Sequence, residues 1–344
     1  MIEIGGRSVG PGMPCYVIAE AGVNHDGDVD RALALVHAAK DAGADAVKFQ
    51  LFRADDLATA TAPKARYQTE TTGAGEPQAE MLRALELPDE AYVRVAEEAR
   101  AAGIDFLCTP YSERDADVLA PLVPAFKVAS AFIVEPLFLA HLAALGKPIL
   151  LSTGMATIAE IHDALAIVRG ADVILLQCTS EYPAPAADAN LRVMEALERE
   201  FGVVVGFSDH TEGDAASIAA VALGACVLEK HFTLDRTLPG PDHRASLEPA
   251  ELAALVRQVR EVEAALGSAE KKPTAAEVEN RGRMRRSLVA AVDIPAGTRL
   301  TAAHVALKRP GDGMPPRMFD DVVGASARAD IPRDTQLSSD LLEP

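Results

Sequence analysis

Eight short apolar runs alternate with eight longer helical patterns in this sequence. Runs rich in Val, Ile, Leu and Phe are typical of parallel strands that are buried on both faces. The expected strands are Tyr16–Ala21, Ala46–Leu51, Asp105–Thr109, Ala125–Ala129, Pro148–Ser152, Val173–Cys178, Val203–Phe207 and Cys226–Phe232. The expected helices are Asp30–Ala42, Pro88–Ala102, Glu113–Leu122, Glu135–Leu145, Ile158–Arg169, Asn190–Glu200, Asp214–Leu223 and Pro249–Leu266.

Glycines follow or end most of the helical patterns, as left-handed caps do. These glycines are Gly43, Gly103, Gly146, Gly170, Gly202 and Gly224. Eight β-then-α units within about 250 residues predict an α/β fold of the TIM (β/α)8 barrel type. A doubly wound sheet usually has fewer strands and is the weaker alternative.

The sequence after the last helical pattern changes character. We expect a barrel over 1–266, a charged and polar linker over 267–286, and a small β-rich domain over 287–344. In this last part, the stretch from Asp293 to Leu300 is echoed by the stretch from Asp330 to Leu337, which predicts a pseudo-symmetric unit. A domain of this size is marginal alone and gains from docking. Within the barrel, the polar segment Thr59–Gln78 interrupts the alternation and is interpreted as an active-site flap.

Charge and cysteine content exclude several classes of function. The formal charge of −18 disfavours nucleic acid and anionic membranes as partners. The four cysteines lie in apolar runs without a CxxC pair, which indicates buried reduced thiols rather than a zinc cluster. The sequence shows neither a signal-peptide pattern nor a membrane-spanning run, so we expect a cytoplasmic protein.

Polar side chains occur where the expected strands end, which is the face that carries the active site in barrel enzymes. They are Glu20, Lys48, Gln50, Thr109, Lys127, Ser130, Ser152, Ser180, Ser208, His210, Glu229 and His231. Alternate residues of a strand share one face, so Lys48 lies on the same side as Gln50, and Glu229 on the same side as His231. One such lysine would be interpreted as a solvated strand end, but charges at the ends of five strands together predict a functional site.

Two of these residues suggest a metal. His210 and His231 end neighbouring strands, and two imidazoles placed in this way can bind one ion. Water, a substrate oxygen and Glu20 would complete an octahedral shell of the kind that suits Mn²⁺. On spacing alone, a metal site and a pair of structural histidines are both consistent with the sequence. The two lysines, the hydroxyls of Thr109, Ser130, Ser152 and Ser208, and the backbone around Gly154 would suit an anionic phosphate.

Several motifs, in order along the chain, resemble one family. They are Ile18–Gly27, Gly43–Gln50, Cys108–Ser112, Lys127–Ser130, Leu151–Met155, Gln177–Pro183, Gly206–Thr211, Leu228–Thr233, Pro239–His243 and Lys308–Gly311. Together they resemble the N-acetylneuraminate synthase family, which includes sialic, legionaminic and pseudaminic acid synthases. The C-terminal region resembles the antifreeze-like (SAF) domain of that family.

The resemblance implies an enzyme that condenses phosphoenolpyruvate with an amino-sugar aldehyde, such as N-acetylmannosamine or a diacetamido sugar, to a nonulosonic acid and phosphate. His210 and His231 would hold a divalent ion, Mn²⁺ or else Mg²⁺ or Co²⁺, that polarises the aldehyde. Lys48, Lys127 and the four hydroxyls would contact phosphoenolpyruvate, with Glu20 orienting the aldehyde or water. The residues implied to hold the sugar and support the site are Gln50, Ser180, Tyr182, Glu229 and Asp242. The resemblance also implies a domain-swapped homodimer in which Arg309 reaches the N-acyl group in the partner's barrel.

The chain departs from the family pattern at two positions. Phe132 stands where many relatives carry a glutamate that contacts the acceptor, and Ser180 stands where the sialic acid branch often carries Asn. The flap around Tyr67 is similar to the legionaminic and spore-coat branches. Two alternatives follow: another phosphoenolpyruvate aldol enzyme, of the Kdo-8-phosphate or DAHP synthase type, or a carbohydrate-binding protein without turnover.

Overall fold

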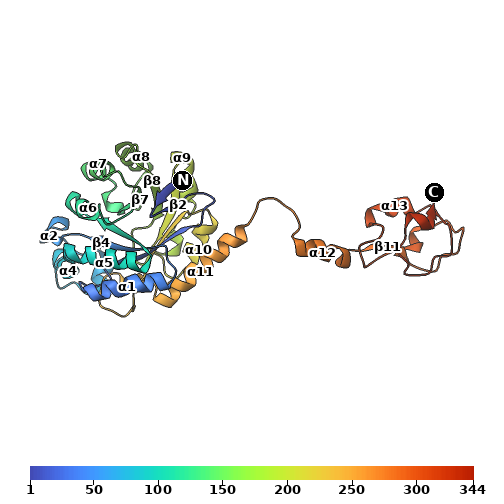
Figure 1. Ribbon diagram of the computed structural model, residues 1–344, viewed down its shortest axis with the longest axis horizontal. Coiled ribbons are helices and arrows are strands. Elements are labelled where there is room, and N and C mark those ends of the chain that lie inside the picture. The colour runs from blue at the N-terminus through green and yellow to red at the C-terminus, as the bar shows by residue number, and fades with distance from the viewer. The chain divides into compact units, whose positions relative to one another are not determined.

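The computed structural model describes residues 1–344 and divides the chain into two compact units, Met1–Gly267 and Ser268–Pro344. In the first unit, eight parallel strands close into a barrel with helices around it (Figure 1). The barrel strands are β3 (Tyr16–Gly22), β4 (Ala46–Leu51), β5 (Asp105–Pro110), β6 (Phe126–Val128), β7 (Ile149–Ser152), β8 (Val173–Cys178), β9 (Val204–Asp209) and β10 (Val227–His231). Closure joins β10 to β3, with Val227 opposite Tyr16 and His231 opposite Glu20. The predicted barrel is confirmed, and the doubly wound alternative is excluded.

Helices follow the strands as the sequence predicts. The outer helices are α1 (Val29–Asp41), α5 (Asp89–Ala102), α6 (Glu113–Leu119), α7 (Pro136–Ala144), α8 (Ile158–Ile167), α9 (Val193–Phe201), α10 (Ala215–Ala222) and α11 (Pro249–Leu266). Their ends are encoded locally: the Thr157 side chain accepts from the Glu160 N–H at the start of α8, and Gly103 ends α5 in the left-handed conformation. None of the helices combines the length and apolar character that crossing a bilayer requires.

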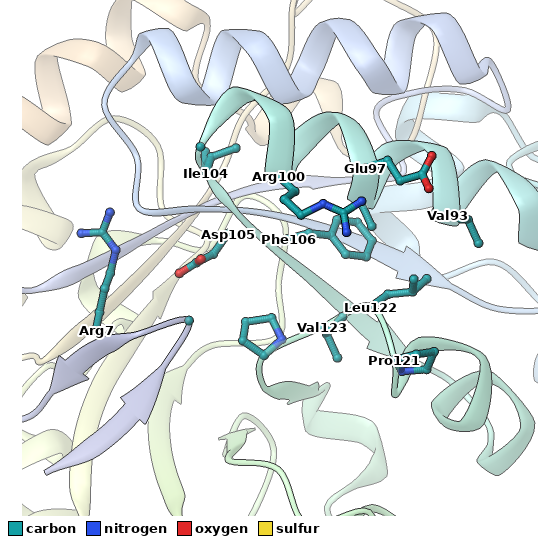
Figure 2. A pocket seen from close by; sticks show the side chains of 14 residues that line it. Arg7, Val93, Glu97, Arg100, Ile104, Asp105, Phe106, Pro121, Leu122 and Val123 are labelled. Carbon is teal, nitrogen blue, oxygen red and sulfur yellow. The ribbon is translucent and has the colours of Figure 1, made fainter.

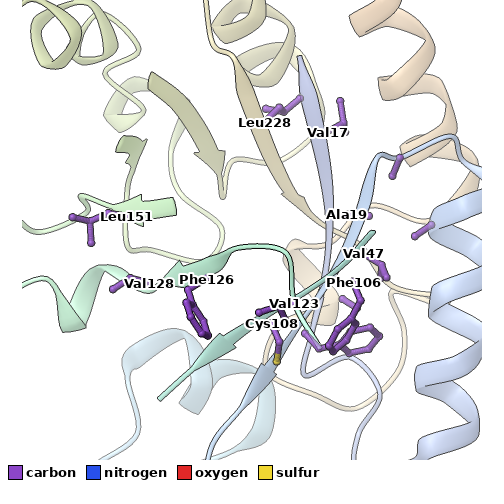
Figure 3. Close-up of a cluster of buried hydrophobic side chains, with 14 of the residues drawn as sticks. Val17, Ala19, Val47, Phe106, Cys108, Val123, Phe126, Val128, Leu151 and Leu228 are labelled. Carbon is purple, nitrogen blue, oxygen red and sulfur yellow. The ribbon is translucent and has the colours of Figure 1, made fainter. Parts of the chain in front are cut away.

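Two apolar layers hold the barrel together. The outer layer packs strand residues such as Val47 and Phe106 against the helices (Figure 3). The inner layer fills the lumen with residues of the alternate strand face, including Ile18, Leu107 and Ile174. A hairpin of β1 (Ile2–Ile4) and β2 (Arg7–Val9) adds apolar side chains to this lumen cluster. The lumen is therefore apolar in this layer, which leaves the carboxyl ends of the strands for polar side chains.

The segment Thr59–Gln78, which we expected to be a polar loop, contains the short helix α3 (Arg66–Thr72). It lies between α2 (Ala54–Leu57) and α4 (Gln78–Ala84). Buried Gln68 accepts hydrogen bonds from the Ala65 N–H and the Gln78 amide, both at 3.0 Å. These bonds order the segment without the apolar periodicity by which a helix is predicted.

The second unit contains α12 (Ala275–Met284), which lies in the stretch that we expected to be a linker. The Thr274 side chain caps this helix, and the Gly311 N–H donates to the Gly282 carbonyl at 2.7 Å. The helix has no buried residues, and its sequence therefore lacks the apolar periodicity from which a helix is predicted. The remaining elements are β11 (Ser287–Ala290), β12 (Val305–Lys308), α13 (Phe319–Val322), β13 (Ser326–Ala327) and β14 (Leu342–Glu343).

The echoed sequences of the second unit form a pseudo-symmetric pair. Ile294 and Ile331 exchange backbone hydrogen bonds, each 2.8 Å long. Asp330 accepts from the Ala296 N–H, and Asp293 accepts in the same way from the Arg333 N–H, both at 2.8 Å. The hairpin of β11 and β12 likewise has its counterpart in β13 and β14. Each half therefore supplies the hydrogen-bond partners of the other half's turn.

Candidate active site

One cavity of about 360 Å³ lies at the carboxyl ends of the barrel strands. It is lined by all but two of the predicted site residues: Glu20, Lys48, Gln50, Thr109, Lys127, Ser130, Ser152, Ser180, Tyr182, Ser208, His210, Glu229 and His231. The strand alternation explains the convergence, because Lys48 and Gln50 of β4 reach the same side, as do Glu229 and His231 of β10.

The two remaining predicted residues lie elsewhere. Asp242 does not line the cavity but is buried next to it, with its Oδ2 atom 4.0 Å from His231 Nδ1. Burial raises the pKa of Asp242 to about 6, although His243 and Lys48 oppose this shift. Arg309 belongs to the second unit, where its Nε atom donates to the Met284 carbonyl at 3.0 Å.

Two lysines and two glutamates form a buried charge cluster in the cavity. Lys48 Nζ lies 2.7 Å from Glu20 Oε2 and 3.8 Å from Glu229 Oε2, and Lys127 Nζ lies 3.4 Å from Glu229 Oε1. All four side chains are buried. Lys48 also donates to Thr109 Oγ1 at 3.1 Å. Charges of both signs thus offset one another where an unpaired charge would be costly.

The two glutamates differ in acidity because their neighbours differ. Burial raises the pKa of Glu20 to about 7, with the nearby Glu229 charge adding to the effect and Lys48 opposing it. Burial also disfavours the charged form of Glu229, but Lys127 and Lys48 outweigh it and lower the pKa of Glu229 to about 2. Near neutral pH, Glu229 is therefore ionised, whereas Glu20 can hold or release a proton.

The two histidines face each other across the end of β9 and β10, with ring centroids 5.5 Å apart. His210 Nδ1 lies 2.7 Å from the Thr179 carbonyl, to which it donates, so Nε2 keeps its lone pair. The buried Nδ1 atom of His231 has no hydrogen-bond partner. Burial lowers the pKa of His210 to about 4 and that of His231 well below its usual range. Both imidazoles are therefore neutral at pH 7, the form that binds metals.

Hydroxyl groups gather around Gly154 on the opposite wall. The Gly154 N–H donates to Ser130 Oγ at 3.0 Å, and that hydroxyl lies 3.1 Å from Cys178 Sγ. A Cβ atom at Gly154 would come within 2.4 Å of Ser180 Oγ, so only glycine allows these side chains to meet. The buried Ser152 hydroxyl has no hydrogen-bond partner. This wall can supply hydroxyl donors to an anion.

Several cavity residues were not among the predicted site residues. The Tyr111 hydroxyl donates to Gln50 Oε1 at 3.0 Å, and the Gln50 amide donates to Glu20 Oε1 at 2.8 Å. Tyr67, from the flap, lies 5.0 Å from Tyr182 between ring centroids. Both tyrosines had a sequence signal: Tyr67 lies in the segment that interrupts the alternation of strands and helices, and Tyr111 lies in the motif Cys108–Ser112.

Phe132 lines the cavity beside Tyr111, edge to face, with ring centroids 5.2 Å apart. Its other aromatic neighbour is Phe138 of α7, at 5.5 Å. The wall at this position is therefore apolar.

Two protein families match successive parts of this chain. Residues 35–271 match the NeuB family, and residues 285–343 match the SAF domain. The N,N'-diacetyllegionaminic acid synthase of Legionella pneumophila is 42% identical over 95% of this chain and 94% of its own.

Two solved structures are also similar. The N-acetylneuraminic acid synthetase of Leptospira borgpetersenii, in complex with citrate, has a TM-score of 0.72 at 33% identity and covers 81% of this chain and 94% of its own. The spore coat polysaccharide biosynthesis protein SpsE of Bacillus subtilis has a TM-score of 0.65 at 36% identity and covers 99% of both chains.

Proposed function

Because this chain belongs to the NeuB family and carries a SAF domain, we propose that it joins phosphoenolpyruvate to the open-chain aldehyde of an N-acylated amino sugar. The products are a nonulosonic acid and inorganic phosphate. One observation carries the proposal: two buried lysines, two buried glutamates and two neutral histidines line a single cavity at the carboxyl end of the barrel.

Phosphoenolpyruvate binds through the cationic and hydroxyl groups of the cavity. Lys48 and Lys127 offset the charge of its carboxylate and phosphate. Thr109, Ser130, Ser152 and Ser208 supply hydroxyl groups, of which Ser152 Oγ has no competing partner within the protein. Holding two reactants in register contributes about 7–11 kcal/mol of barrier lowering in favourable cases.

The electron pair of the enol double bond then forms the new carbon–carbon bond, from C3 of phosphoenolpyruvate to the aldehyde carbon. The π electrons of the aldehyde carbonyl move to its oxygen, which takes up a proton and becomes a hydroxyl group. Water adds at the electron-deficient C2 and loses its protons, and C2 becomes a ketone carbon as the C2–O bond breaks and phosphate leaves with the enol oxygen. Glu20 orients the aldehyde or the water and holds the exchanged proton at Oε2, since its pKa of about 7 allows both protonation states. Glu229 stays ionised and keeps Lys127 and Lys48 in place.

A divalent cation fits the two histidines. Both are neutral, and His210 presents Nε2 because its Nδ1 donates to the Thr179 carbonyl. No group of three or more His, Cys, Asp or Glu side chains comes together as a complete metal site, so water and substrate oxygens must supply the other ligands. That ligand set suits Mn²⁺, with Mg²⁺ or Co²⁺ as alternatives. When bound, the cation supplies Lewis-acid polarisation of the aldehyde oxygen.

The acceptor is N-acetylmannosamine or a related diacetamido sugar, and the 42% identical legionaminic acid synthase favours the latter. Gln50, Ser180 and Tyr182 line its side of the cavity, with Asp242 buried next to them. Phe132 contacts an apolar part of the sugar. We further propose a homodimer in which Arg309 of a second copy completes the site. Mixing the inactive variants His210→Ala and Arg309→Ala should then restore part of the activity, whereas a site within one copy would stay inactive.

Release of phosphate from phosphoenolpyruvate, measured with a panel of hexosamines and diacetamido sugars with and without Mn²⁺, tests the proposal. We expect release with an N-acylated amino sugar, stimulated by Mn²⁺ and abolished by His210→Ala while the barrel stays folded. Release only with phosphorylated aldoses would indicate an enzyme of the Kdo-8-phosphate or DAHP type. No release with any sugar would indicate a binding protein, and normal activity of His210→Ala would remove the metal assignment.

A further inference from the structure

An ion pair lies directly behind the two histidines and has no role in the chemistry above. Asp209 ends β9, and Lys230 is the neighbouring residue on β10, in register with it. Lys230 Nζ lies 3.0 Å from Asp209 Oδ2, and both side chains are 0% exposed. Neither residue lines the cavity, because strand alternation turns them to the opposite face of the barrel wall.

A fully buried ion pair is a poor source of stability. Removing two charges from water costs several kcal/mol per ion, and well-packed apolar side chains often stabilise a protein as well or better. The outer core of the barrel, which includes Val221 and Leu228, is apolar. The pair therefore calls for a reason other than stability, and its contacts point to one.

Those contacts fix the backbone on both sides of His210. Asp209 Oδ1 accepts from the Thr211 N–H and from the Thr211 hydroxyl, both at 2.8 Å, so it bridges across His210. Lys230 Nζ donates to the Thr211 carbonyl at 2.5 Å, and Ser217 of α10 donates to Asp209 Oδ2 at 2.5 Å. The segment 209–211 is thereby tied to β10 and to α10.

The same pair fixes the second histidine through its strand. Lys230 lies between Glu229 and His231, both of which line the cavity. Lys230 and Asp209 are the last of three paired positions in the β9–β10 ladder, so their ion pair reinforces the register of the two strands next to both imidazoles. Register between strands is strongly specified where one face is buried, as it is here.

We propose that the Asp209–Lys230 ion pair is a positioning element, which holds His210 and His231 in the arrangement that binds one divalent cation. The inference rests on the proposed function, because it assigns the pair to the same two histidines. It adds two residues that act through the histidines and touch neither substrate nor metal.

The test uses the full chain and a double variant, Asp209→Asn with Lys230→Met, which leaves no unpaired charge in the core and so preserves folding. Lys230→Arg retains the charge and serves as the conservative variant. Asp45→Asn is the matched control, because Asp45 is another buried aspartate that accepts a backbone N–H, from Val17, and pairs with a cation, Arg260, but at the amino end of β4. Thermal unfolding confirms that each variant is folded.

Two readouts separate positioning from stability. Titration calorimetry with Mn²⁺ alone should show binding weakened by about 10- to 100-fold in the double variant, as for other residues that orient metal ligands. Lys230→Arg should recover most of the affinity, and Asp45→Asn should bind as wild type does. In the metal-free protein, ¹⁵N NMR of the histidines should show one Nδ1–H tautomer for His210 in the wild type and a mixture in the double variant.

A folded double variant with wild-type Mn²⁺ affinity and a single His210 tautomer would overturn the inference. The metal assignment fails separately, if His210→Ala binds Mn²⁺ as tightly as wild type. In that case the tautomer spectra still decide whether the pair positions His210.

Discussion

The two ends of the barrel handle buried charge in different ways. At the amino end, Asp45 accepts from the Val17 N–H at 2.9 Å and faces Arg7 and Arg260 at 3.1 and 2.7 Å. At the carboxyl end, Glu229 keeps a buried oxygen without a hydrogen-bond partner. The buried Ser152 Oγ and His231 Nδ1 atoms also lack a hydrogen-bond partner. Partners missing within the protein are typical of groups that serve a ligand.

Cavity size alone would not identify the candidate active site. A hollow of about 600 Å³ lies beside the β1–β2 hairpin and α5, larger than the 360 Å³ cavity with the charge cluster. Figure 2 shows Arg7, Glu97, Arg100 and Asp105 among its lining residues, beside the apolar Phe106 and Leu122. Asp105 already accepts from the Tyr16 hydroxyl at 2.7 Å. Four of the buried polar atoms without a hydrogen-bond partner, in Glu20, Ser152, Glu229 and His231, belong to residues that line the smaller cavity, and none belongs to the larger hollow. These atoms, rather than volume, distinguish the candidate active site.

The largest expected effect concerns a cavity lysine. Lys127→Met should lower turnover by about 10²–10³-fold, as loss of one preorganised charged donor does. It should also lower thermal stability, because buried Glu229 loses the cation 3.4 Å away. Arg260→Met, at the amino end, should change turnover by no more than about twofold. Phosphate release and thermal unfolding of both variants provide the measurement. Equal losses of turnover in the two variants would erase the distinction between the ends.

Acid should destabilise the carboxyl end through His210. Its folded-state pKa of about 4 lies below the usual 6.5, so its contribution to stability is present above pH 6.5 and is lost as the pH falls towards 4. At 1.36 kcal/mol per pKa unit, the loss is on the order of 3 kcal/mol. His210→Gln should lack this loss in urea unfolding with EDTA present. Parallel pH curves for the two proteins would contradict a buried neutral imidazole.

At the amino end, Asp45→Asn should lower the stability of the protein and leave its turnover nearly unchanged. Weakening its contacts with the Val17 N–H and the two arginines should lower the free energy of unfolding by about 1–3 kcal/mol. Turnover should stay within about twofold of wild type, because no atom of Asp45 reaches the cavity. Denaturant unfolding and phosphate release give the two values. A loss of turnover at unchanged stability would contradict a purely structural amino end.

The smallest effect is expected at the flap. Arg66 of α3 forms an ion pair with Glu181, which precedes the cavity residue Tyr182. Both charges are solvent-accessible, and exposed pairs contribute about 0.2–1 kcal/mol. Arg66→Ala should therefore raise the KM for the sugar by no more than about fivefold, with kcat within about twofold. Glu181→Ala should raise the KM for the sugar by the same factor. If the two residues act only through their ion pair, the KM of the double variant should equal that of either single variant.

The barrel could be predicted because each of its strands is a continuous apolar run, and alternation then assigns Lys48, Gln50, Glu229 and His231 to one face. The β1–β2 hairpin was not predicted, because strands of three residues are too short for periodicity to detect. The helix α12 was missed because it has no buried face.

Contacts within the site were less accessible to sequence reasoning. The acidity difference between Glu20 and Glu229 depends on which glutamate has Lys127 as a neighbour, and only the folded barrel fixes that distance. Asp209 and Lys230 did carry a signal: each adjoins a cavity histidine in an apolar strand, so alternation turns its charge into the opposite core. Two charges facing that core in adjacent strands require each other as partners.

The reciprocal turns of the second unit have a consequence for how it unfolds. The carboxylates of Asp293 and Asp330 each bind backbone of the other half, and Ile294 and Ile331 are joined by two mutual hydrogen bonds. If one half unfolds, the other half loses these hydrogen-bond partners. Neither half is therefore expected to stay folded as a separate fragment. Amide exchange of Ala296 and Arg333 should accordingly rise together, at one common opening free energy, as in a cooperative folding unit.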